Sequence, residues 1–62
     1  MDFATEREMV RLRHELRRFS AESRGKEAAP ALERLRLLAR LDAARADTLH
    51  RELCRWEVSL GL

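Results

Sequence analysis

Residues 23–30 read Ser23-Arg24-Gly25-Lys26-Glu27-Ala28-Ala29-Pro30 and interrupt a sequence that otherwise has the composition of long helices. The chain has no tyrosine and few β-branched residues, while Ala, Leu, Arg and Glu are abundant, which favours helices over strands. Glycine often closes a helix, and proline is tolerated in the first turn of one. We therefore expect Gly25 to end one helix in the left-handed conformation and Pro30 to lie at the start of the next.

This break predicts an all-α fold. We expect an antiparallel two-helix hairpin, with a helix over about 3–23, a turn over about 24–29 and a helix over about 30–59. The first helix is expected to begin near Asp2 or Thr5, because both residues can cap a helix, and the second to stop before Gly61. A chain of 62 residues allows one small domain, residues 1–62.

Apolar residues in the first predicted helix recur at steps of three and four and form one narrow stripe. Phe3 and Val10 lie nearly opposite that stripe, so a single packing partner leaves them uncovered. The predicted hairpin core consists of Met9, Leu12, Leu16, Phe19, Leu32, Leu35 and Ala39.

The second predicted helix carries apolar residues at steps of three and four along its whole length and outruns the first by roughly 14 Å. Large apolar side chains on this overhang predict an interaction site. An alternative is that the last turns bend back and cover the hairpin end. The predicted partner interface consists of Ala46, Leu49, Leu53, Trp56 and Leu60.

A lone two-helix hairpin of this size has only a marginal core, so we expect a second copy or another helical protein to complete it to a bundle. Asp42 interrupts the apolar seam of the second helix. It either sets the register by pairing with an arginine across the interface, or it lies at the edge and pairs with Arg45 three residues on.

Residues that could carry chemistry are few. His50 and Cys54 could supply two zinc ligands, but a structural zinc site needs four, and His14 is expected roughly 16 Å away. The same pair lacks a cleft and an orienting third group, so we expect an inert, buried Cys54. We expect no catalytic residue, no metal, no cofactor, no small-molecule substrate and therefore no enzyme.

The alternative function is a homodimeric four-helix bundle that binds RNA or another nucleic acid. Arg7, Arg11 and Arg18 put positive charge on the outer side of the first helix. Glutamates share the same turns and largely cancel this charge, and no aromatic residue is interleaved for base stacking. Salt separates the two functions, because a nucleic-acid complex weakens steeply with ionic strength.

The cysteine content and the charge pattern indicate the cellular compartment. A single cysteine suits a reducing environment, the first residues are charged, and no run approaches the roughly 18 apolar residues of a membrane span. We expect a cytoplasmic protein without a signal peptide and without membrane contact.

Arg24-Gly25, followed sixteen residues after the glycine by Leu41-Asp42-Ala43-Ala44, resembles the turn and second helix of the small co-chaperones of type III secretion needle subunits. The resemblance covers part of the chain. It implies a helical hairpin that pairs with a larger helical-repeat chaperone to hold the needle subunit soluble before export. Glu22 and Ser23 depart from it, since apolar residues are expected there. The apolar stripes lead us to expect a non-enzymatic protein–protein interaction module that docks them on a partner, and the resemblance implies that this module is a secretion co-chaperone.

Overall fold

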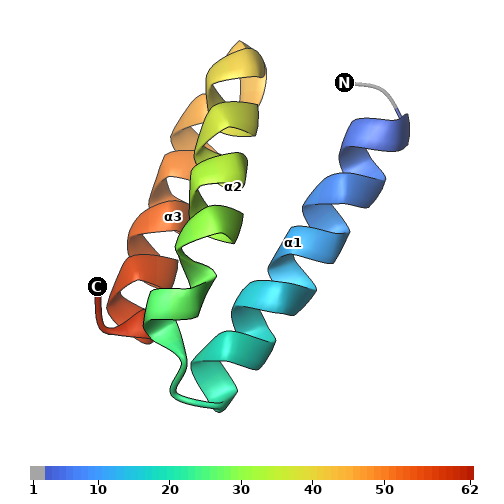
Figure 1. Cartoon of the computed structure of the whole chain (residues 1–62). Coiled ribbons are helices and arrows are strands. Elements are labelled where there is room, and N and C mark those ends of the chain that lie inside the picture. The colour runs from blue at the N-terminus through green and yellow to red at the C-terminus, as the bar shows by residue number, and fades with distance from the viewer. Residues whose placement is uncertain (1–2) are drawn as a thin grey trace.

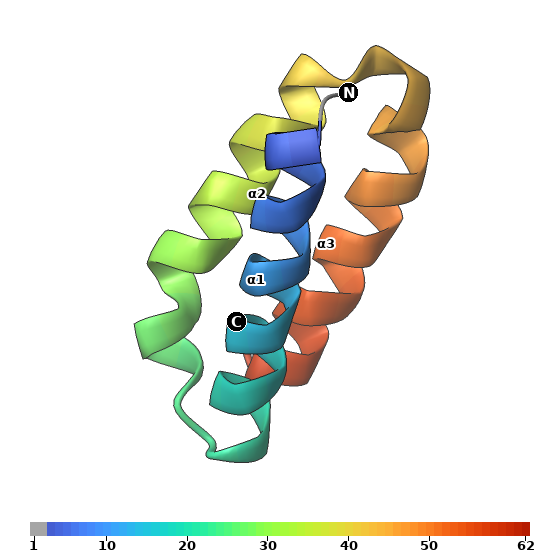
Figure 2. The ribbon, with the colours of Figure 1, turned by 90° about the vertical axis from the view of Figure 1, so that its right-hand side faces the viewer.

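The computed structural model describes residues 3–62 and folds them into a bundle of three helices, α1 (Phe3–Ala21), α2 (Ala29–Leu41) and α3 (Ala46–Leu60). Two short 3-10 turns, η1 (Gly25–Ala28) and η2 (Ala43–Arg45), connect them. The chain runs along α1, returns along α2 and reverses again into α3, so that α1 and α3 point in the same direction (Figures 1 and 2). The predicted all-α fold is confirmed, whereas the predicted second helix over 30–59 is wrong because it is split in two.

The core lies where α1, α2 and α3 face one another. Among residues 3–62 no polar or charged side chain is buried. Of the predicted hairpin core, Phe19 is only partly buried and packs against the rest. The buried residues are Met9, Leu12, Leu16, Ala28, Ala31, Leu32, Leu35, Leu38, Ala39, Leu49, Leu53 and Leu60.

The connection between α1 and α2 begins with a Schellman motif, in which carbonyls of the last helical turn accept hydrogen bonds from amides just beyond the helix. The amide of Arg24 donates to the carbonyl of Phe19 over 2.8 Å, and the amide of Ser23 donates to that of Ser20 over 3.3 Å. Ser23 takes the left-handed conformation, with a φ of 56°. The prediction that Gly25 takes it is therefore wrong.

Gly25 is required for a different reason, namely the close approach of two backbones. A Cβ atom at this position would lie 2.0 Å from the carbonyl oxygen of Leu60, at the end of α3. Any larger residue here would push the turn away from α3. Pro30 lies in the first turn of α2, as predicted.

The ends of the outer helices match the sequence only in part. α3 ends at Gly61, which has a φ of 76° and donates to the last carbonyls of the helix, so this predicted stop is confirmed. α1 begins at Phe3, which places Thr5 inside the helix and not at its cap. The other predicted cap, Asp2, lies outside the described residues.

The second reversal of the chain, which we call the corner, spans residues 42–45 and replaces the predicted continuous helix. Asp42 leaves the helical conformation with φ −120° and ψ 87°. The bend lets Leu49, Leu53 and Leu60 reach the core. Burying a leucine side chain is worth about 2 kcal/mol, while each backbone hydrogen bond lost at a bend costs about 1 kcal/mol. The apolar gain therefore decides in favour of bending.

An ion-pair cluster holds the corner. The guanidinium of Arg45 donates from Nε to Oδ2 of Asp42 over 3.0 Å and from Nη2 to Oε1 of Glu6 over 2.5 Å. The bond from Arg45 also lowers the pKa of Asp42. Of the two interpretations of Asp42, the pairing with Arg45 is confirmed, and the register role inside a continuous helix is wrong.

The edge between α1 and α3 repeats one spacing along its length. Each of three polar contacts joins residues that are 39 apart, and successive contacts are seven residues apart along α1 and along the segment from Arg45 through α3. Seven residues span two helical turns and return to the same side of a helix. The two parallel helices therefore keep one register. The contacts are Glu6 with Arg45, Arg13 with Glu52 and Ser20 with Ser59.

Candidate functional site

The predicted partner interface lies inside the chain's own bundle. Leu49, Leu53 and Leu60 are buried, and Ala46 and Trp56 are partly buried. The overhang that predicted this interface does not exist among residues 3–62, because the corner folds α3 back on α1 and α2. A surface for a partner must be sought elsewhere.

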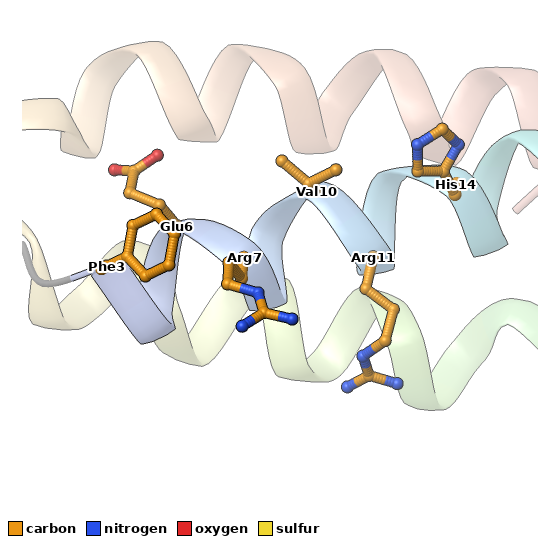
Figure 3. Close-up of a pocket in the computed structure, with 6 residues that line it drawn as sticks. All are labelled: Phe3, Glu6, Arg7, Val10, Arg11 and His14. Carbon is orange, nitrogen blue, oxygen red and sulfur yellow. The ribbon is translucent and has the colours of Figure 1, made fainter.

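The side of α1 that faces away from the core carries the clearest apolar surface. The side chain of Phe3 is 77% exposed and that of Val10 is 50% exposed. They are seven residues apart, so they lie on the same side of α1, as the sequence predicts. They border an open depression of about 490 Å³ (Figure 3). We call this the α1 outer surface; its lining residues are Phe3, Glu6, Arg7, Val10, Arg11 and His14.

Charged side chains flank this apolar strip. Arg7 and Arg11 extend on one side of α1, and Glu6 extends on the other (Figure 3). The guanidinium carbon of Arg7 lies 5.8 Å from the centre of the Phe3 ring, a cation–π distance. Arg11 donates from Nη1 to Oε1 of Glu15 over 3.1 Å, which offsets its charge. The negative charge of Glu6 is offset by its salt bridge with Arg45 at the corner. The charge of Arg7 therefore leaves this surface positively charged.

The predicted nucleic-acid contacts share this side of α1. Arg7, Arg11 and Arg18 are all exposed, and their spacing of four and seven residues keeps them in one row. Arg18 lies with its guanidinium carbon 5.3 Å from the centre of the Phe19 ring. The row therefore exists, although Arg11 is paired with Glu15.

A second depression, of about 400 Å³, lies between α1 and α3. We call it the Trp56 groove. Arg13 donates from Nε and Nη2 to the two carboxylate oxygens of Glu52 over 2.8 and 2.9 Å. The indole Nε1 of Trp56 donates to the same carboxylate over 3.1 Å. Its lining residues are Arg13, Arg17, Glu52, Arg55, Trp56 and Ser59.

The carboxylate of Glu52 is the only negative charge of the groove lining. Its pKa is lowered, first by the hydrogen bond from Arg13 and further by that from Trp56. Glu52 therefore stays ionised and fully engaged. Within residues 3–62, neither Arg17 nor Arg55 forms a salt bridge or a side-chain hydrogen bond. The groove thus carries two positive charges that no salt bridge offsets.

The soft metal ligands are scattered. His14 lies on the α1 outer surface, while His50 and Cys54 are exposed on α3. No group of three or more His, Cys, Asp or Glu side chains that could hold a metal ion occurs within residues 3–62. The prediction of a buried Cys54 is wrong, because Leu53 faces the core and the next residue is rotated by about 100° away from it.

Sequence reasoning missed the Trp56 groove. Arg17 and Arg55 meet there only because α3 folds back beside α1, and the continuous-helix prediction separated them. A usable signal was present in the matching spacing of Glu6, Arg13 and Ser20 with residues of the last helix. Complementary polar residues at seven-residue intervals indicate two parallel neighbouring helices.

Comparisons with known proteins add no family to this description. None of the helices within residues 3–62 is long and apolar enough to cross a membrane. No protein-family model matches the chain, and no curated protein or solved structure is detectably similar to it.

Proposed function

We propose that this protein is a non-enzymatic interaction module that binds an amphipathic helix of another protein along the α1 outer surface. The observation that carries the proposal is the exposure of Phe3 and Val10 on one side of α1, over an open depression. Apolar side chains at seven-residue intervals form the strip against which a second helix packs. The bundle supplies a rigid support for that strip.

The charge of the surface favours a different protein over a second copy of this chain. Packing the α1 outer surface on itself would bring Arg7 of both copies into one interface. Like charges that face each other across an interface oppose association. A partner helix with acidic residues beside its apolar strip has the complementary charge.

The resemblance to co-chaperones of type III secretion needle subunits stays a prediction. The α1 outer surface is where such a protein would hold a helical client. The overhang from which the sequence derived that role is absent from residues 3–62, so Phe3 and Val10 take over its part in the proposal. The free, exposed thiol of Cys54 suits a reducing compartment, which supports a cytoplasmic location.

Nucleic-acid binding remains the second candidate, because Arg7, Arg11 and Arg18 form an exposed row. It predicts a steep loss of affinity between low and moderate salt, whereas apolar helix docking predicts a shallow one. Titration of a 12-nucleotide single-stranded RNA at two salt concentrations checks this candidate directly.

Selection from a displayed library of helix-forming 21-residue peptides tests the proposed function. Peptides enriched on the wild-type protein are expected to bind Val10→Asp at least tenfold more weakly, because an unpaired carboxylate would be placed in the apolar contact. Val58→Asp is the matched control, since Val58 is 81% exposed on α3 and lies outside both depressions. Enriched peptides that bind Val10→Asp and Val58→Asp equally would contradict the proposal.

A further inference from the structure

The Trp56 groove continues the α1 outer surface along the same helix. The first surface ends at His14, and the groove begins at Arg13 and Arg17. Val10 and Arg17 are seven residues apart on α1, which corresponds to about 10 Å along the helix axis. One partner helix of ordinary length can therefore contact both.

The chemistry changes along this path from apolar to cationic. Phe3 and Val10 provide the apolar end, while Arg17 of α1 and Arg55 of α3 line the groove together with Trp56. Glu52 lowers the net charge of the groove, and its pKa is lowered first by the hydrogen bond from Arg13 and in part by nearby Arg55. Arg13, however, occupies both carboxylate oxygens of Glu52, and Trp56 shares one of them. The groove thus has an internal charge pair and two further cations.

We infer that the Trp56 groove binds an acidic side chain of the partner helix, placed between the guanidinium groups of Arg17 and Arg55. This inference rests on the proposed docking of a helix at Val10. A guanidinium binds a carboxylate through paired, charge-assisted hydrogen bonds, and the indole of Trp56 supplies an apolar wall for the methylene groups of a glutamate. The partner therefore carries a glutamate or aspartate about one heptad beyond the apolar residue that contacts Val10.

A protein carboxylate fits this place better than a nucleic-acid backbone. Phosphates follow one another at every nucleotide, so a strand along α1 could pair with Arg7 but would leave the exposed apolar side chains of Phe3 and Val10 without a partner. An amphipathic helix can instead place apolar residues against Phe3 and Val10 and an acidic residue further along, against Arg17 and Arg55. The test therefore also measures the binding of a single-stranded RNA.

The test uses one enriched helical peptide and a copy of it in which its acidic residues are replaced by glutamine. Calorimetry measures both affinities, and the emission of Trp56, the single tryptophan of the chain, shows whether the groove is occupied. We expect the acidic peptide to bind about tenfold more tightly than its glutamine copy, from two charge pairs made by the exposed Arg17 and Arg55. We expect only the acidic peptide to change the emission.

Two protein variants locate the effect. The double variant Arg17→Gln with Arg55→Gln is expected to bind both peptides equally and as weakly as the wild type binds the glutamine copy. The matched control is Lys26→Gln with Arg40→Gln, which removes the same charge from residues outside the groove. We expect it to keep most of the tenfold difference.

The outcomes separate this inference from the proposed function. Equal binding of both peptides to the wild type, still lost in Val10→Asp, would overturn the acidic anchor and leave helix docking in place. Peptides insensitive to Val10→Asp would overturn both. A single-stranded RNA that binds more tightly than the acidic peptide, and loses that binding in the Arg17 and Arg55 variant, would overturn the inference in favour of nucleic acid.

Discussion

The two connections of the bundle reverse the chain by different means. Between α1 and α2 the turn is built from the left-handed Ser23 and from Pro30 at the start of α2, and Gly25 within it lets the turn approach Leu60 at the end of α3. The corner between α2 and α3 has neither glycine nor proline, and it bends at Asp42 before two alanines. Helix-ending and helix-starting residues mark the first reversal in the sequence, whereas only the burial of side chains far along α3 fixes the second.

Gly25→Ala tests the first connection and should have the largest effect. The new Cβ atom would meet the carbonyl oxygen of Leu60 at 2.0 Å, so the turn or the end of α3 must move. We expect a loss of about 3 kcal/mol in the free energy of unfolding, measured by urea denaturation. Gly61→Ala is the control: its Cβ has open space and only the left-handed backbone opposes it, at about 1 kcal/mol. Equal losses would show that the approach to Leu60 is not tight.

Ser23→Gly tests the same connection and should raise the free energy of unfolding, where Gly25→Ala lowers it. Ser23 holds a left-handed conformation that costs a residue with a side chain about 1 kcal/mol, and glycine adopts it freely. We expect the variant to be more stable by about 1 kcal/mol in thermal and urea unfolding. Ser23→Ala keeps the unfavourable conformation and should show no gain. A gain in Ser23→Ala of the same size would argue against the Schellman motif.

Ala43→Pro asks whether the corner is really bent. Ala43 opens the η2 turn directly after Asp42, whose extended backbone is compatible with a following proline. We expect the free energy of unfolding to be unchanged or to rise by about 0.5 kcal/mol. In a continuous helix the same change would cost about 3 kcal/mol. Arg40→Pro, inside α2, is the matched control that should show such a loss.

Acidification should weaken the corner, with the smallest effect of the four. Arg45 lowers the pKa of Asp42 in the folded protein, so Asp42 stabilises the fold above its unfolded pKa, and this contribution is lost as the pH falls through the lower folded pKa. Urea unfolding at pH 6 and pH 3 should therefore show a smaller acid-induced loss in Asp42→Asn than in the wild type. Asp47→Asn, which breaks no salt bridge among the described residues, is the control. Identical losses in all three proteins would contradict this role.

The helical class and the first break could be predicted because their causes are local. Composition indicated the helices, Pro30 indicated the start of α2 and Gly61 indicated the end of α3. The corner could not be predicted in this way, because alternating steps of three and four continue through Asp42 without a helix breaker. The chain bends because the arrangement that buries the leucines of α3 has a lower free energy than a continuous helix that leaves them uncovered.

The two parts of the candidate site also differ in whether the sequence alone could identify them. Phe3 and Val10 could be identified from the sequence, because helical periodicity alone places them opposite the core. The Trp56 groove could not, since Arg17 and Arg55 are 38 positions apart and only the fold brings them together. The predicted partner interface included Leu53 and Leu60, which the fold instead buries in the chain's own core. This burial also depends on the corner, which the sequence pattern did not indicate.

The constant offset of 39 residues between α1 and α3 restricts how such a sequence can change in length. Adding or deleting one residue inside α2 would rotate the rest of that helix, and α3 with it, by about 100° and shift both by about 1.5 Å. All three polar contacts of the edge would lose their partners in the same event, together with the leucines of α3. Divergence of this chain is therefore expected through substitutions, because an insertion anywhere between Glu6 and Ser59 would separate at least one of these pairs.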